Sequence, residues 1–315
     1  MCGKYFSTPD GVPADGIILT FAAYQYWMRA GLARMQKAMT IMRAAFSASV
    51  WLMTASLLGA NPQAAFADDA VVRIGGTGIA LAALQQVGAS LMAAEPGIQV
   101  DVLPSMGTSG GMKALGEGAI EIAVAARTLT AAEKANGLRQ AACITTAVVF
   151  ASSHKAASGL TKAQLPGLYA DPSPKWPDGT PLKVILRSRA GTENPYLVAE
   201  VPDMAMALDK AYKRHGMPVG PTDQDNAKLA TQTSGSLAVM TLLQVRAERL
   251  DLTVLPLDGV NATVQTLADK TYPLPIHVCI MTQSDPTPAT ARFVAHFRSA
   301  AGKAVIESLG AALTE

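Results

Sequence analysis

Residues 70–127 read AVVRIGGTGIALAALQQVGASLMAAEPGIQVDVLPSMGTSGGMKALGEGAIEIAVAAR. Three Val- and Ile-rich runs, at 70–74, 98–105 and 120–127, alternate with two segments of helical composition, at 79–95 and 112–119. Glycine turns separate strand from helix, and such alternation is typical of a mostly parallel sheet with helices on its faces. This stretch therefore predicts an α/β fold.

The same alternation continues to the C-terminus. The expected elements are a helix at 129–137, strands at 142–152 and 181–187, helices at 197–215 and 226–230, a turn and helix over 233–250, strands at 252–258 and 273–282, and helices over 289–310.

No linker interrupts the chain, so we expect two lobes that share crossing strands. Residues 142–150 would lead from the first lobe to the second, and 252–258 would lead back. The predicted parts are an N-terminal extension with signal peptide (1–67), lobe one (68–148 and 258–315) and lobe two (149–257).

The N-terminal region has the pattern of an export signal. Residues 44–60 carry no charge, Arg43 precedes them, and Ala65-Phe66-Ala67 is a small-x-small cleavage site. This predicts a secretory signal peptide cleaved after Ala67, and hence a periplasmic protein; the alternative is an uncleaved membrane anchor. Residues 1–34 fit no signal peptide and indicate an over-extended start, so N-terminal sequencing of exported material should begin at Asp68.

Composition excludes several classes of function. Half of the residues are hydrophobic, 16% are charged and the formal net charge is +2. Residues 1–67 hold five basic and two acidic residues, so the mature part is near neutral and we expect no nucleic-acid partner. Cys and His are scattered without metal-ligand spacing, so we expect no metal and no cofactor. We expect a monomer.

Three loops share one chemistry. GGTG (75–78), MGTSGG (106–111) and RSRAGT (187–192) each follow an expected strand and combine glycines with hydroxyl side chains, and the first two open a helix. Helix N-termini, approachable glycine backbone and Thr or Ser hydroxyls are neutral donors for an anion, and Arg187 adds a charged fork. Taken singly, the loops are also explained as tight turns, helix caps and a surface ion pair.

The order of these segments resembles the phosphate-binding proteins of ABC transporters. The resemblance runs over about residues 70–310, through VVRIGGTGIALAALQQ, IQVDVLPSMGTSGGMKALGEGAIEIAVAARTLT, GLTKAQLPGLYAD, KWPDGTPLKVILRSRAGT, PTDQDN, TSGSLAVMTL, LDGV and YPLPIHVCI. It implies the type II periplasmic-binding fold, with two α/β lobes that close on phosphate, and an inner-membrane permease as partner.

The resemblance also implies which residues bind the anion. They are Thr77 and Gly78 in the first loop, Thr108, Ser109 and Gly110 in the second, and Arg187 and Thr192 in the third. The third loop is shorter than in the family, which makes Arg189, Gly191 and Thr192 harder to align.

One position departs from the family. Where its members place an Asp that accepts the proton of phosphate, this chain has Ala126 followed by Arg127. We therefore expect poorer discrimination between phosphate and sulfate. Arg127 either contacts the anion or forms a salt bridge, and we expect Glu121 on the neighbouring strand to be structural.

The same resemblance places Cys143 and Cys279 on neighbouring strands. A disulfide and a pair of buried thiols are both open, because sequence does not show their geometry.

Three other functions compete with transport. A dinucleotide enzyme is disfavoured, because Gly76-x-Gly78 is followed at the third position by Leu81 and not by Gly or Ala. A hydrolase is disfavoured because GxSxG does not occur and no His lies in the glycine loops. A sensor or accessory binding protein without a transport role has the same sequence pattern, so it stays open.

Overall fold

The computed structural model describes residues 70–189 and 191–314. The predictions for residues 1–67, including the signal peptide, the cleavage after Ala67 and the over-extended start, lie outside the described residues. Within the described ranges, no helix is both long enough and apolar enough to cross a membrane.

The chain alternates between strands and helices. In order the elements are β1 (Val71–Gly76), α2 (Leu81–Ala94), β2 (Gln99–Val102), α3 (Gly107–Gly116), β3 (Ile122–Ala125), α4 (Ala131–Ala135), β4 (Leu138–Ser152), η2 (Lys162–Gln164), α5 (Leu165–Ala170), β5 (Lys183–Arg187), α6 (Glu193–Glu200), α7 (Met204–Lys213), β6 (Val219–Gly220), α8 (Asp223–Gln232), β7 (Ser236–Thr241), α9 (Leu242–Ala247), β8 (Thr253–Val254), α10 (Val264–Ala268), β9 (Pro275–Gln283), α11 (Pro288–Arg298), α12 (Ala300–Ser308) and β10 (Ala311–Thr314).

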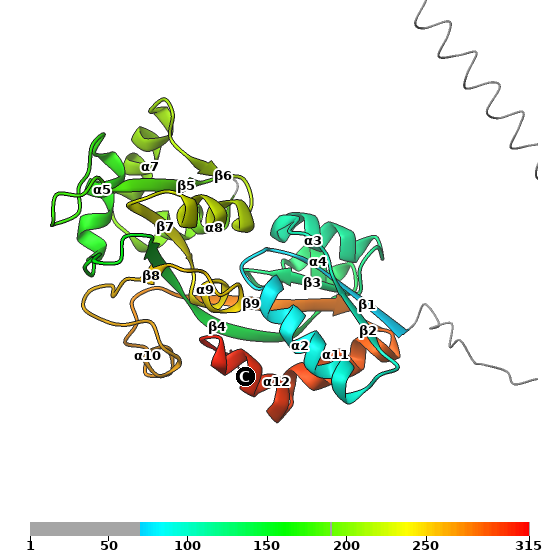
Figure 1. Ribbon diagram of the computed structural model, residues 1–315. Coiled ribbons are helices and arrows are strands. Elements are labelled where there is room, and N and C mark those ends of the chain that lie inside the picture. Colours follow the sequence, from blue (N-terminus) through cyan, green and yellow to red (C-terminus); the bar gives the residue numbers. More distant parts are fainter. Residues whose placement is uncertain (1–69, 190, 315) are drawn as a thin grey trace, which may run out of the picture. The chain divides into compact units, whose positions relative to one another are not determined.

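The strands form one mixed sheet in the order β2-β1-β3-β9-β4-β7-β5-β6, with β8 and β10 also paired to β4. Pairs are parallel near both ends of this order, β1 with β2 and β3, and β5 with β6 and β7. The pairs around β4 and β9 are antiparallel. Figure 1 shows β4 running from the helices around β1 toward those around β7, with β9 beside it.

Strand β4 joins the two largest of the three hydrophobic cores among the described residues. Ile144 belongs to the core that contains Ile74 and Phe293, whereas Phe150 belongs to the core that contains Ile185. Along β4 the burial pattern changes from intermittent to continuous, because its second half is covered on both faces. The predicted crossing strand is therefore present.

The chain returns between the cores along β9. Ile276 packs in the core of Phe150, and Val278 packs in the core of Ile74. Residues of the segment before β9, including Leu257 and Leu274, also pack with Phe150. The division of the chain into lobes at residues 148 and 258 stays a prediction. The packing concerns its second boundary, because Leu274 follows residue 258 and yet packs in the core of Phe150.

Several predicted elements need correction. The helix expected over 197–215 is two helices, α6 and α7, because Pro202 lies between them and Asp203 has a φ of 62°. The turn and helix expected over 233–250 also contain β7, whose six residues are all buried and so show no alternation. The strand at 252–258 shortens to β8, and α3 begins at Gly107, inside the expected loop.

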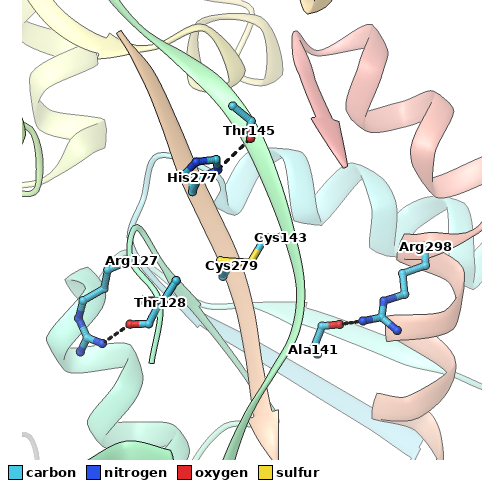
Figure 2. Close-up of a disulfide and its surroundings, with 8 residues drawn as sticks. All are labelled: Arg127, Thr128, Ala141, Cys143, Thr145, His277, Cys279 and Arg298. Carbon is cyan, nitrogen blue, oxygen red and sulfur yellow. Dashed lines mark hydrogen bonds between the residues drawn. A yellow bond between two sulfur atoms is a disulfide. The ribbon is translucent and has the colours of Figure 1, made fainter. Parts of the chain in front are cut away.

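A disulfide joins Cys143 and Cys279 (Figure 2), so the open choice between a disulfide and two thiols is decided for the disulfide. The two residues face each other in the register of β4 and β9, with their Cα atoms 4.0 Å apart. Two residues further along β4, the hydroxyl of Thr145 hydrogen-bonds Nδ1 of His277 at 2.9 Å. The bond thus links the two strands that connect the cores.

Candidate functional site

The three glycine-containing loops meet at one cavity of about 700 Å³. Six of the eight predicted ligand residues line it: Thr77, Thr108, Ser109, Arg127, Arg187 and Thr192. These come from loops far apart in the sequence, which the sheet places together because parallel strands carry the following loops at the same edge.

The second loop forms the N-terminus of α3. Gly107 has a φ of 71°, a conformation that favours glycine, and Gly111 packs so closely on β1 that a Cβ there would lie 2.6 Å from Cα of Gly76. Met106 is the N-cap and its side chain makes no capping hydrogen bond. The first backbone N–H groups of α3 are therefore available as donors at the cavity.

Thr108 adds a hydroxyl to these donors. Its Oγ1 accepts a hydrogen bond of 3.3 Å from the backbone N–H of Ala126. This leaves the hydroxyl proton of Thr108 to be donated to a ligand.

Gly78 and Gly110 do not line the cavity and instead permit close packing. A Cβ at Gly78 would lie 2.6 Å from both Oδ2 of Asp223 and Oε1 of Gln224. Nε2 of Gln224 also donates to the carbonyl oxygen of Gly78 at 3.2 Å. Gly110 packs against the side chain of Met106.

Arg187 is at the centre of a buried polar cluster. Its Nε donates to Glu193 at 3.0 Å, its Nη2 to Asp223 at 2.6 Å, and its Nη1 to the carbonyl oxygens of Gly220 and Thr222. Only 4% of Arg187 is exposed. The guanidinium fork predicted for the ligand is therefore already bound to two carboxylates and two carbonyls.

Burial raises the pKa of Glu193 to about 6, and the nearby charge of Asp223 acts in the same direction, although Arg187 opposes both. A carboxyl group whose pKa is raised on folding contributes stability at low pH. The contribution of Glu193 is complete below its unfolded pKa of 4.5 and is lost as the pH rises through about 6.

Arg127 is paired in the same way, but at the surface. Its guanidinium makes two hydrogen bonds to Glu133, of 2.8 and 2.7 Å, while 38% of its side chain stays exposed. The hydrogen bond from Arg127 lowers the pKa of Glu133 to about 2. Of the two alternatives for Arg127, the salt bridge is observed, and the residue also lines the cavity.

Two further predicted positions are structural. Glu121 accepts hydrogen bonds from the backbone and the side chain of Arg73. Arg189 does not line the cavity, and its guanidinium lies 4.2 Å from the ring centre of Tyr212.

Sequence reasoning missed Asp223, which lines the cavity and is 4% exposed. It begins α8 directly after Thr222, whose hydroxyl accepts from the backbone N–H of Asp225 in a capping box. The Thr-x-x-Asp spacing predicts the start of a helix, but it does not indicate that Asp223 packs on Arg187.

No three His, Cys, Asp or Glu side chains among the described residues are grouped as metal ligands. The chemistry of the cavity is instead that of backbone N–H groups, hydroxyls and paired arginines.

We expect Thr108→Ala to weaken anion binding by about 1–2 kcal/mol, because one neutral donor is lost. Calorimetry measures the change. Thr231→Ala is the matched control, since within the described part of the chain the hydroxyl of Thr231 bonds only to its own helix, at Ala227 and Lys228. Equal affinities for wild type and Thr108→Ala would remove Thr108 from the site.

Comparison with known proteins supports the fold. No curated protein matches the sequence. A candidate phosphate ABC transporter substrate-binding protein from Clostridium perfringens, solved with bound phosphate, is 18% identical with a TM-score of 0.64, and the match covers 78% of this chain and 100% of that one. An ABC-type phosphate transport receptor from Vibrio cholerae is 19% identical with a TM-score of 0.53, covering 77% and 100%.

The reduced form of OxyR from N. meningitidis reaches a TM-score of 0.53 at 11% identity, covering 78% of this chain and 100% of that one. Structural similarity at such low sequence identity therefore identifies the fold of this chain but does not identify its ligand. The predicted two-lobed periplasmic-binding fold is confirmed. The domain model of the PBP superfamily matches residues 61–301, and the chain belongs to that superfamily.

Proposed function

We propose that this protein is a periplasmic solute-binding protein that captures a small oxyanion, phosphate first, between two lobes and delivers it to an ABC transporter permease in the inner membrane. Binding would draw the lobes together, because the cavity is lined by loops of both predicted lobes, with Thr108 from lobe one and Arg187 from lobe two. In this proposal the protein binds its solute and does not transform it.

The observation that carries the proposal is the set of neutral donors around the cavity. The uncapped start of α3 and the hydroxyls of Thr77, Thr108, Ser109 and Thr192 all lie at its wall. A desolvated oxyanion needs its charge spread over several preorganised donors, because an unpaired buried charge is costly. Such a wall suits a small tetrahedral anion better than an apolar solute.

A panel of anions tests the proposal directly. Phosphate, arsenate, sulfate, molybdate and phosphonates are added to the purified protein, and thermal unfolding is followed. A ligand at about 100 times its dissociation constant stabilises by roughly 2.7 kcal/mol, which for a domain of this size is a rise in Tm of about 5–10 °C. If no oxyanion raises Tm, the protein has the fold without this function.

A sensor or accessory protein would give the same result on that panel. Addition of the phosphate-loaded protein to a reconstituted permease separates the two, because only a transport component stimulates its ATPase. Size-exclusion chromatography tests the expected monomer.

A further inference from the structure

The cavity is larger than a single inorganic oxyanion needs. Its volume is about 700 Å³, and cavities of about 300–1,000 Å³ are the size in which proteins enclose organic ligands of many atoms. Closure of the lobes would reduce the volume, but the same side chains would still form the wall. The chemistry of that wall therefore indicates what the space beside an oxyanion accepts.

One side of the cavity is apolar. Ile276 of β9 lines the cavity, is 4% exposed and belongs to the core of Phe150. Ala126 and Tyr196 also line the cavity, and both are partly buried and pack against the same core. We call Ala126, Tyr196 and Ile276 the apolar wall. It brings the hydrophobic core to the surface of the cavity, where a bare inorganic anion has no apolar group to pack against it.

The hydroxyl of Tyr196 is not available to an anion. It donates its one proton to the carbonyl oxygen of Pro275, at 2.5 Å. Pro275 immediately precedes Ile276 on β9, so this hydrogen bond holds α6 against β9 at the cavity. Because the proton is already donated, what Tyr196 can offer a ligand is the face or edge of its aromatic ring.

The apolar wall meets the hydrogen-bond donors at Ala126. The backbone N–H of Ala126 donates to the hydroxyl oxygen of Thr108 at 3.3 Å, so the two residues are direct neighbours. An oxyanion held by Thr108 and by the start of α3 would therefore have the apolar wall beside it. A substituent on that anion could reach the wall while the charged head kept its donors.

The cations of the cavity do not replace this contribution. Arg127 and Arg187 line the cavity, but each is already paired with a carboxylate. Hydrogen bonds from neutral donors are weaker than those from charged donors. Burial of an apolar group against the wall would add binding free energy that the paired arginines do not supply.

We infer that the solute carries its phosphoryl head on a compact apolar organic group, as in an alkyl or aryl phosphonate or phosphate monoester, and that the apolar wall binds this group. The inference rests on the proposed function and narrows its class of solute. The head occupies the donors at α3, and the organic group packs on Tyr196 and Ile276. Inorganic phosphate makes only the contacts of the head, so it binds more weakly.

Calorimetry on wild type with phosphate, methylphosphonate, phenylphosphonate and phenyl phosphate tests the inference. We expect the two phenyl ligands to bind at least about tenfold more tightly than phosphate, because they bury apolar surface and contact an aromatic ring. Methylphosphonate has the head of phenylphosphonate without the large apolar group, so it should bind more weakly than phenylphosphonate. The heat-capacity change on binding should be more negative for the phenyl ligands, since it reports buried apolar surface.

Three variants of α6 locate the subsite. Tyr196→Ala should weaken the binding of phenylphosphonate about tenfold and that of phosphate less than about threefold, whereas Tyr196→Phe should bind both like wild type because it keeps the ring. Val198→Ala is the matched control, since Val198 lies on the same helix, is 43% exposed and does not line the cavity. It should leave the affinity for phenylphosphonate unchanged.

The outcomes separate this inference from the proposed function. If wild type binds none of the ligands, the proposed function is overturned. If phosphate binds as tightly as the phenyl ligands, the function stands and the inference fails, and this comparison does not depend on the folding of any variant. The inference also fails if Tyr196→Ala weakens phosphate as much as phenylphosphonate, or if Val198→Ala weakens phenylphosphonate as much as Tyr196→Ala does.

Discussion

Arg187→Ala is expected to lower the free energy of unfolding by about 3–5 kcal/mol, because it leaves two buried carboxylates without their cation. Glu193 and Asp223 are 1% and 4% exposed, so water cannot replace the guanidinium. The same change should cost on the order of 2–5 kcal/mol of anion affinity, since Asp223 at the cavity wall then lacks its cation and repels the anion. Urea denaturation measures the first effect and calorimetry the second.

Arg127→Ala is the matched control for Arg187→Ala. Arg127 lines the same cavity and is also bound to a carboxylate, but 38% of its side chain is exposed. Exposed ion pairs contribute about 0–1 kcal/mol, so Arg127→Ala should change the unfolding free energy by no more than that. Equal losses for the two variants would show that burial of the Arg187 cluster has no energetic effect.

The position of the site could be predicted from the sequence because it follows from local patterns. Glycine and hydroxyl residues after successive strands mark loops at one edge of a parallel sheet, and six of the eight predicted ligand residues line the cavity. Gly78 and Gly110 share the same signal but serve packing. A glycine that lets a ligand approach and a glycine that lets a helix approach look alike in sequence.

The electrostatics of the site could not be predicted in this way. The sequence predicts Arg187 either as a charged donor for the anion or as a surface ion pair, but its partners are buried and lie six and 36 residues away along the chain. Which carboxylates reach a guanidinium depends on how α6 and α8 pack on β5, and periodicity does not encode that packing. The weak phosphate selectivity expected from Ala126 stays a prediction, and the periodicity also gave no sign that Asp223 lines the cavity as a buried carboxylate.

Strand β7 was missed for a related reason. Ser236–Thr241 is buried throughout, so its sequence SLAVMT lacks the alternation of a half-exposed strand and continues without a break into the apolar start of α9. Periodicity alone does not separate a fully buried strand from a buried helix. Strands β4 and β9 were predicted because their β-branched runs are longer, although the return crossing was expected at 252–258 and not along β9.

The bond between Cys143 and Cys279 is expected to contribute about 4–5 kcal/mol to stability if its effect is that of closing a loop in the unfolded chain. The sequence separation is 136 residues, so the loop that the bond closes in the unfolded chain is long. The residues next to the bond, Ala142 and Ile144 on β4 and Val278 and Ile280 on β9, all belong to the core of Ile74, so the bond fixes the register of the two connecting strands within that core.

Urea denaturation with and without reductant measures this contribution, and the double variant Cys143→Ala/Cys279→Ala is the control. Reductant should destabilise wild type and leave the double variant unchanged, because the variant has no such bond to lose. Equal stability of oxidised and reduced wild type would contradict the prediction. Since neither cysteine lines the cavity, an unchanged phosphate affinity in the folded double variant would show that the bond acts on stability alone. A loss of affinity there would instead show that the register of β4 and β9 sets the spacing of the loops around the anion.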